Sequence, residues 1–84
     1  MGFEEYVCVT FQNVHTALQF ERQCKHLNTS LRLIPVPRRI SATCGMAAKM
    51  TLKEWQQLQS SNDICLLEFE KVYLIQEEQI SEIF

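Results

Sequence analysis

Hydrophobic and polar positions in the first half of the chain follow spacings typical of alternating strands and helices. Tyr6 to Phe11 is rich in β-branched and aromatic residues and predicts a strand buried on both faces. Asn13 suits a helix N-cap, and the apolar positions that follow recur at helical spacing as far as Leu27, which predicts the first helix. Leu31 to Ile34 predicts a second strand, which the next prolines stop because proline cannot donate to a ladder.

The second half of the chain repeats this order. Thr51 and Glu54 form a capping-box pattern, which predicts that a helix begins at Thr51 and leaves Gly45 to Met50 as a short third strand. We expect Ser60 to Asp63 to fray or end that helix. Phe69 to Ile75, with its β-branched and aromatic residues, predicts a fourth strand.

The predicted order is therefore β-α-β-β-α-β. With right-handed crossovers it folds as an α+β, ferredoxin-like two-layer sandwich, in which two helices cover one face of an antiparallel sheet. We expect one domain over residues 1–84, with a core at about 5–76 and an acidic, apolar tail at 77–84. Within the tail, Ile80, Ile83 and Phe84 have the spacing of a short amphipathic helical turn.

This topology brings one loop close to one helix end. The first strand ends, and the first helix begins, at the edge of the sheet where the second and third strands are joined. We therefore expect the loop from Pro35 to Cys44 to lie near Asn13 and His15, at the N-terminus of the first helix.

Composition and charge narrow the classes of function. The formal net charge of the 84 residues is -2, which gives no electrostatic support for binding nucleic acid. No apolar run approaches the roughly 18 residues of a membrane helix, and the N-terminus lacks the layout of a signal peptide. The four cysteines are widely spaced without a zinc signature, so we expect a cytoplasmic protein with free thiols and neither metal nor cofactor.

Cys44 is the residue with the clearest chemical potential. Two cations, Arg38 and Arg39, precede it, and the positive end of the first helix is expected nearby; both favour a thiolate. Gly45 would let a substrate or partner approach the backbone closely. The alternative is an ordinary cysteine in a small polar loop. The other three cysteines, Cys8, Cys24 and Cys65, lie on apolar faces and are expected in the core.

The charged and polar residues expected near Cys44 each have two possible roles. Arg38 and Arg39 could bind a small anion such as a carboxylate, a phosphate or a sulfur oxyanion, or they could only keep the loop solvated. His15 could serve as a neutral hydrogen-bond donor or general base near a helix start, or it could be structural.

The loop motif resembles a family of small bacterial proteins described as selenium/sulfur-carrier-like. The resemblance covers about residues 5 to 76 and includes His15 to Leu18, Pro35 to Arg38 and Ser41 to Gly45. It implies a carrier cysteine at Cys44, with Arg38 and His15 as candidate helpers. The chain departs from the family pattern at the interrupted second helix and in the acidic tail.

These observations lead to one main hypothesis and two others. The first is a non-enzymatic carrier that accepts sulfur or selenium on Cys44 from a donor protein, as a persulfide or selenopersulfide, and passes it to an acceptor protein. The second is a small ligand-binding or protein-interaction module in which Cys44 is incidental. The third is a homo-oligomeric scaffold that associates through its apolar tail.

Overall fold

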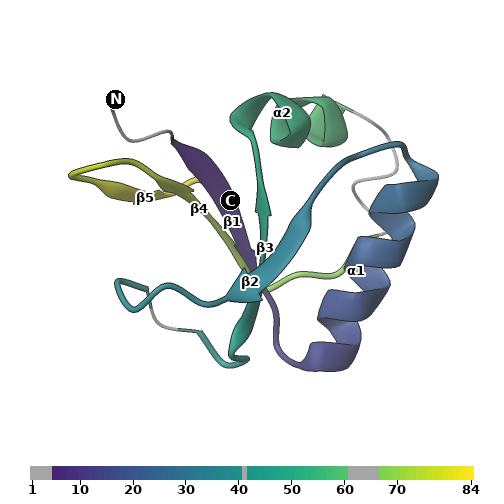
Figure 1. The fold of residues 1–84 in the computed structure, drawn as a ribbon, viewed down its shortest axis with the longest axis horizontal. Helices are drawn as coiled ribbons and strands as arrows, with labels where there is room; N and C mark the ends of the chain where they lie inside the picture. The colour runs from purple at the N-terminus through teal and green to yellow at the C-terminus, as the bar shows by residue number, and fades with distance from the viewer. Residues whose placement is uncertain (1–4, 41, 61–66) are drawn as a thin grey trace.

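The computed structural model describes residues 5–40, 42–60 and 67–84 of the chain. Within these residues the architecture is α+β, with two helices and a five-stranded antiparallel sheet (Figure 1). In chain order the elements are β1 (Tyr6–Thr10), α1 (Val14–His26), β2 (Arg32–Pro35), β3 (Met46–Met50), α2 (Leu52–Ser60), β4 (Lys71–Ile75) and β5 (Ile80–Glu82).

Both helices begin at the caps that the sequence predicts. The side chain of Asn13 accepts a hydrogen bond of 2.8 Å from the backbone N–H of Thr16 at the start of α1. At the start of α2 the hydroxyl of Thr51 accepts one of 3.1 Å from the N–H of Glu54. The carboxylate of Glu54 does not return to Thr51 but accepts from the N–H of Ser30 at 3.3 Å, so one half of the predicted capping box is formed.

The strand β1 lies inside the sheet, between β3 and β4 in the order β2-β3-β1-β4-β5. Successive side chains of a strand point to opposite faces. Val7 and Val9 therefore pack against the helices, while Cys8 points to the other face, and all three are fully buried. The prediction of a first strand buried on both faces is confirmed.

The sheet has a core on each face. The larger cluster lies between the sheet and the helices, and its helical members are Ala17, Phe20 and Cys24 of α1 with Trp55 and Leu58 of α2. The smaller cluster lies on the face without helices and is centred on Cys8, Ala47 and Ile75. Val36 and Ile40 pack against this second cluster, so the proline-containing loop after β2 covers part of the helix-free face.

The predicted ferredoxin-like β-α-β-β-α-β order is not matched by the structure, because a fifth strand follows β4. Ile80 pairs with Ile75 across a turn in which the N–H of Gln76 donates to the carbonyl of Gln79 at 2.8 Å. The tail was expected to form a short helical turn, and this expectation is wrong. An isolated turn of helix is marginal in water, whereas the free edge of β4 offers backbone partners to an extended chain.

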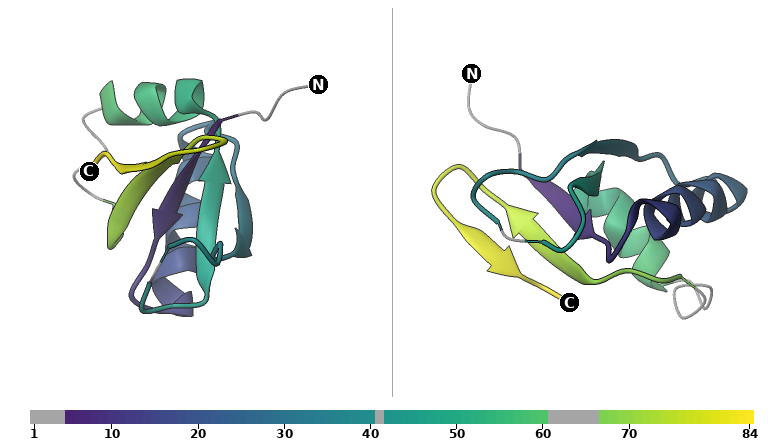
Figure 2. Two further views of the ribbon diagram at one scale, coloured as in Figure 1. Left: turned by 90° about the vertical axis from the view of Figure 1, so that its left-hand side faces the viewer. Right: turned by 90° about the horizontal axis from the view of Figure 1, so that it is seen from below.

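The position of α2 also differs from the predicted sandwich, in which the two helices form one layer on the sheet. In Figures 1 and 2, α1 runs along the sheet whereas α2 lies across one end of it, crosswise to α1. Only Thr51 separates the end of β3 at Met50 from the start of α2 at Leu52, so α2 begins directly at that end of the sheet. The described residues include no helix long and apolar enough to cross a membrane.

Candidate functional site

The bend Thr43 to Gly45 leads directly into β3 and carries the candidate cysteine. Thr10, the last residue of β1, is paired with Ala47, so this bend lies beside the point where β1 ends and the chain continues into α1. The loop and the start of the first helix are thus at the same end of the sheet, as the order of the elements predicts.

Cys44 is turned inward at this bend. Its Sγ accepts a hydrogen bond of 3.4 Å from the backbone N–H of Met46, and the residue is only 7% exposed, whereas a carrier needs a thiol that its partners can reach. Gly45 beside it is exposed, and a side-chain carbon added there would meet no atom within 4 Å. The thiol is therefore sheltered, while the backbone next to it is open to an approaching molecule.

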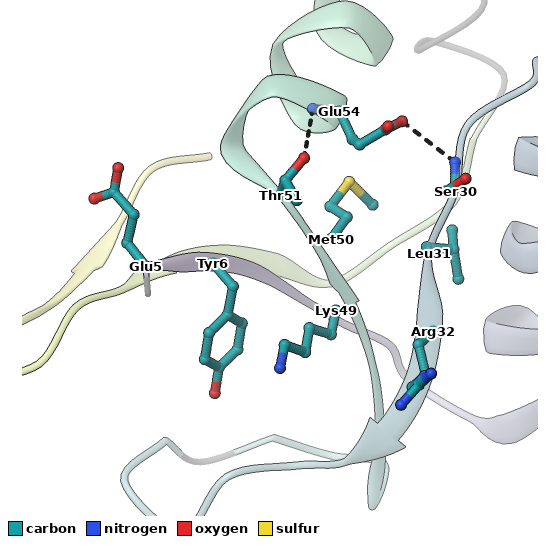
Figure 3. Close-up of a pocket in the computed structure, with 9 residues that line it drawn as sticks. All are labelled: Glu5, Tyr6, Ser30, Leu31, Arg32, Lys49, Met50, Thr51 and Glu54. Atoms are coloured by element: carbon teal, nitrogen blue, oxygen red, sulfur yellow. Dashed lines mark hydrogen bonds between the residues drawn. The ribbon is translucent and has the colours of Figure 1, made fainter. Parts of the chain in front are cut away.

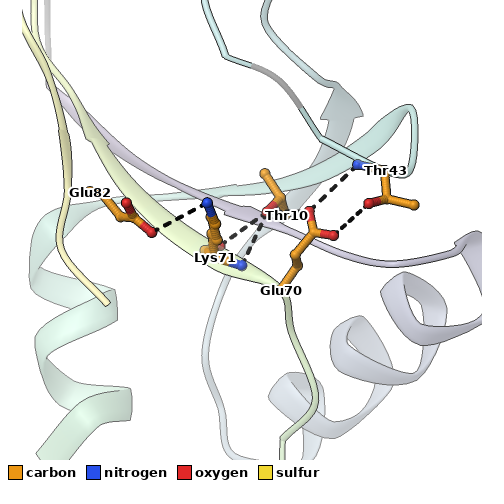
Figure 4. Close-up of polar contacts among 5 residues, drawn as sticks. All are labelled: Thr10, Thr43, Glu70, Lys71 and Glu82. Carbon is orange, nitrogen blue, oxygen red and sulfur yellow. Dashed lines mark hydrogen bonds and ion pairs between the residues drawn. The ribbon is translucent and has the colours of Figure 1, made fainter.

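The carboxylate of Glu70, which directly precedes β4 on the other side of β1, fixes the bend. The hydroxyl of Thr43 donates to Oε2 of Glu70 at 2.6 Å, and the N–H of Thr43 reaches Oε1 at 3.5 Å (Figure 4). The hydroxyl of the buried Thr10 accepts from the N–H of Lys71 at 3.2 Å. Its single proton has two acceptors within reach, Oε1 of Glu70 at 3.4 Å and the carbonyl of Lys71 at 3.3 Å. These contacts bind the bend, the end of β1 and the start of β4 together.

The same contacts change the acidity of Glu70. The hydrogen bond from the Thr43 hydroxyl is the largest cause of a lowered pKa at the Glu70 carboxyl, because it favours the ionised form. Partial desolvation acts in the opposite direction, and the Thr43 amide, the Thr10 hydroxyl and the charge of Lys71 add to the lowering.

The two arginines have different surroundings. Nη1 of Arg39 donates to the carbonyls of Gln76 and Glu77, at 3.5 and 3.4 Å, and so joins the proline-containing loop to the turn before β5. Arg38 is exposed, and within the described part of the chain it makes no hydrogen bond or ion pair. No such contact joins either arginine to Cys44 among these residues.

His15 lies in the first turn of α1 and is exposed. Within the described residues it makes no hydrogen bond or ion pair to Cys44, so it shares an end of the sheet with the thiol without touching it. In residues 5–40, 42–60 and 67–84, no group of three or more histidine, cysteine, aspartate or glutamate side chains could hold a metal ion.

Two other cysteines are structural, as expected. Cys8 and Cys24 are fully buried and unpaired, and burial raises the pKa of Cys8 to about 11 and that of Cys24 to about 12. Their thiols are therefore protonated at neutral pH. Cys65, predicted in the core, and Ser41, part of the loop motif, lie outside the described residues, as does most of the predicted break at Ser60 to Asp63.

Sequence reasoning did not identify Glu70, so its role at the bend emerges only from the structure. The contact between Thr43 and Glu70 joins residues that are 27 positions apart, and no local sequence motif predicts it. One signal was present in the predicted topology. If β1 and β4 are neighbours and antiparallel, the end of β1 meets the start of β4, and Thr10 then faces the residues around Glu70.

Comparison with known proteins completes this picture. The model of a family described as "Putative Se/S carrier protein-like" matches residues 6–74, from the start of β1 to Leu74 in β4, and includes the loop and the bend with Cys44. Searches of curated proteins and of solved structures each found no match. Because the matched segment spans most of the chain, the chain belongs to the Se/S carrier protein-like family.

Proposed function

We propose that this protein carries a single sulfur or selenium atom on Sγ of Cys44 and transfers it between partner proteins. The observation that carries the proposal is the hydrogen bond of 3.4 Å from the N–H of Met46 to Sγ. This contact fixes the orientation of the sulfur at the bend, and the thiolate is the form of cysteine that acts as a nucleophile. Family membership supports the same chemistry, because the matched segment includes this bend.

The transfer needs no external oxidant. The Cys44 thiolate attacks the terminal sulfur of a donor persulfide, R–S–SH; the donor S–S bond breaks as the new one forms, and the donor leaves as R–S⁻. The product is Cys44–S–SH, and attack by an acceptor thiolate on its terminal sulfur then regenerates the Cys44 thiolate. A selenopersulfide follows the same path with selenium as the transferred atom.

The shelter of Cys44 limits the directions from which a donor protein can reach its sulfur. The residue is 7% exposed, which also limits the access of small oxidants to the thiol. A donor can reach it from the side of Gly45, where the backbone is open. Cys8 and Cys24 do not compete, because both are fully buried and protonated at neutral pH.

The roles expected for the neighbouring residues follow from their positions. Arg38, which is exposed and unpaired in the described part of the chain, is a contact for an acidic donor or acceptor. Arg39 acts mainly by holding the loop to the turn before β5. His15 is a second exposed contact at the same end of the sheet. A cytoplasmic setting, where thiols remain reduced, suits such a carrier.

Intact-mass spectrometry after incubation with a low-molecular-weight persulfide tests the proposal. We expect a gain of about 32 Da on Cys44, or about 80 Da with a selenium donor, which disappears when an acceptor thiol is added. Cys44→Ser should prevent the gain, whereas the matched variants Cys8→Ala and Cys24→Ala should retain it.

The same experiment separates the carrier from a binding or interaction module. A protein that never gains the adduct on Cys44, or that gains it equally in Cys44→Ser, is not a carrier at this residue. A binding or interaction module predicts instead that partner binding is the same with and without the Cys44 thiol.

A further inference from the structure

Two cations face each other on the helix-free side of the sheet, away from the bend with Cys44. Arg32 of β2 and Lys49 of β3 are directly opposite in the antiparallel register, and both are exposed. Like charges in this position repel each other and destabilise the strand pair. Such a pair is consistent with a site in which a bound anion compensates the repulsion.

The two cations line a hollow of about 320 Å³ together with Tyr6, Ser30, Thr51 and two carboxylates, Glu5 and Glu54. In Figure 3 the side chains of Arg32, Lys49 and Tyr6 extend from three neighbouring strands in the same direction, away from α2. Nζ of Lys49 lies 4.7 Å from the centroid of the Tyr6 ring, so the aromatic ring forms one wall and holds the ammonium group in place.

The two carboxylates that line the hollow, Glu5 and Glu54, form no ion pair with either cation among the described residues. Oε2 of Glu54 accepts from the N–H of Ser30, and Oε2 of Glu5 accepts from the side-chain amide of Gln76 at 3.1 Å. The ion pair found within the described residues joins Lys71 to Glu82, at 3.7 Å. Neither Arg32 nor Lys49 therefore has a carboxylate partner in that part of the chain.

A third cation approaches the same aromatic ring. The pKa of Tyr6 is raised, first by burial and then by Cys8, while the charge of Arg39 acts in the opposite direction. The positive charge of Arg39 therefore acts on Tyr6, which lines the hollow. Its guanidinium is already occupied by the carbonyls of Gln76 and Glu77, so it adds to the field rather than to the direct contacts.

We propose that Arg32 and Lys49 bind a tetrahedral oxyanion of the phosphate class in this hollow. Arg32 offers a planar fork of N–H donors and Lys49 a compact ammonium charge, a combination suited to a dianion with several acceptor oxygens. Lys49 and Met46 are both in β3, and Met46 contacts the thiol of Cys44. At the usual rise of a strand, Lys49 is roughly 10 Å along β3 from Met46. The site is therefore separate from the carrier cysteine and does not depend on it.

Titration of the whole protein with inorganic phosphate, followed by amide NMR at constant ionic strength, tests this site. We expect saturable shifts at Arg32, Lys49 and the start of α2, with sodium chloride giving none. The double variant Arg32→Gln/Lys49→Gln should weaken binding by about tenfold or more, because two charge-assisted contacts are lost.

A matched control removes the same charge elsewhere. Arg22→Gln/Lys53→Gln changes two exposed cations that do not line the hollow, and it should bind phosphate as the wild type does. Non-saturable shifts, or equal binding by the two double variants, would overturn the proposal. Methyl phosphate distinguishes a phosphomonoester ligand from free phosphate. If it binds more tightly than inorganic phosphate, the site is for a phosphomonoester; if it binds more weakly, the site is for the free anion.

Discussion

The hydroxyl of Thr43 donates a hydrogen bond of 2.6 Å to Glu70, and this contact joins the bend that carries Cys44 to the start of β4. The backbone N–H of Glu70 also donates to the carbonyl of Thr10 at 2.7 Å, so the carboxylate is held in position by β1. The shelter of the thiol therefore depends on a side chain that lies far from it in the sequence.

Thr43→Val should make Cys44 react faster. Valine keeps the shape of threonine but removes the hydroxyl donor, so the bend opens more often and the thiol becomes accessible. We expect alkylation of Cys44 in the native protein to accelerate several-fold, measured by mass spectrometry of peptides over time. Thr16→Val is the matched control, because the Thr16 hydroxyl donates to Asn13 and not to Glu70. Equal rates in the wild type and Thr43→Val would refute the role of this contact.

Glu70 should make the stability of the protein depend on acidic pH. Its pKa in the folded state is lowered from the ordinary 4.5, mainly by the Thr43 hydroxyl. Its contribution is therefore complete above the unfolded-state pKa and is lost as the pH falls through the folded-state value. Urea unfolding at neutral pH and at about pH 3 should show a smaller acid-induced loss in Glu70→Gln than in the wild type.

The exposed neighbour Glu68 provides the comparison for this measurement. Within the described residues its side chain makes no hydrogen bond or ion pair, so Glu68→Gln should retain the acid-induced loss of the wild type. If Glu68→Gln and Glu70→Gln respond alike, the hydrogen bonds at Glu70 are not the source of the effect.

The buried thiols should make the protein sensitive to alkaline pH. Burial raises the pKa of Cys8 to about 11 and of Cys24 to about 12, from 9.0. A raised folded-state pKa gives stability that is complete below pH 9.0 and is lost as the pH rises towards the folded-state value. Cys24→Ala should lose about 1–2 kcal/mol of unfolding free energy at neutral pH, because it leaves a small cavity.

The pH dependence is the decisive part of that experiment. Between about pH 8 and pH 10.5, the unfolding free energy of Cys24→Ala should fall less than that of the wild type, because one raised pKa has been removed. Parallel curves for the two proteins would contradict the assignment of Cys24 to a buried, protonated state.

Local signals were sufficient to predict much of the fold. Asn13 and Thr51 fix the helix starts through contacts within one turn, and the apolar run of β1 predicts burial on both faces. Features that depend on distant partners were not predictable in this way. The strand β5 forms because β4 has a free edge, and Arg39 contacts a turn that this strand creates.

The candidate site shows the same division. The residue types around Cys44 indicate a thiol site, and the order of the elements brings the loop to one end of the sheet. Which side chains touch the bend depends on the register between β1 and β4, since that register brings Glu70 beside Thr10. Charge alone predicted that the arginines would act at the bend with Cys44. In the structure, the side chain that contacts this bend is the carboxylate of Glu70.

Phe84 should stabilise the fifth strand through an aromatic cluster. Its ring lies edge-on to Phe69 and Trp55, with centroid distances of 5.2 and 5.9 Å, although Phe84 is 57% exposed. The backbone beside it pairs with Val72, whose carbonyl accepts from the N–H of Ile83 at 2.8 Å. Phe84→Ala should therefore lower the unfolding free energy by about 1 kcal/mol, the usual size of such ring contacts.

Trp55 reports on this change directly, because it is the one tryptophan in the sequence. Loss of the Phe84 ring exposes an edge of the indole to water, so its fluorescence emission should shift to longer wavelength. Val14→Ala is the control, since Val14 is similarly exposed, at 50%, but lies on α1 and belongs to neither core cluster. If Phe84→Ala leaves both emission and stability unchanged, β5 is held by its backbone pairing with β4 alone.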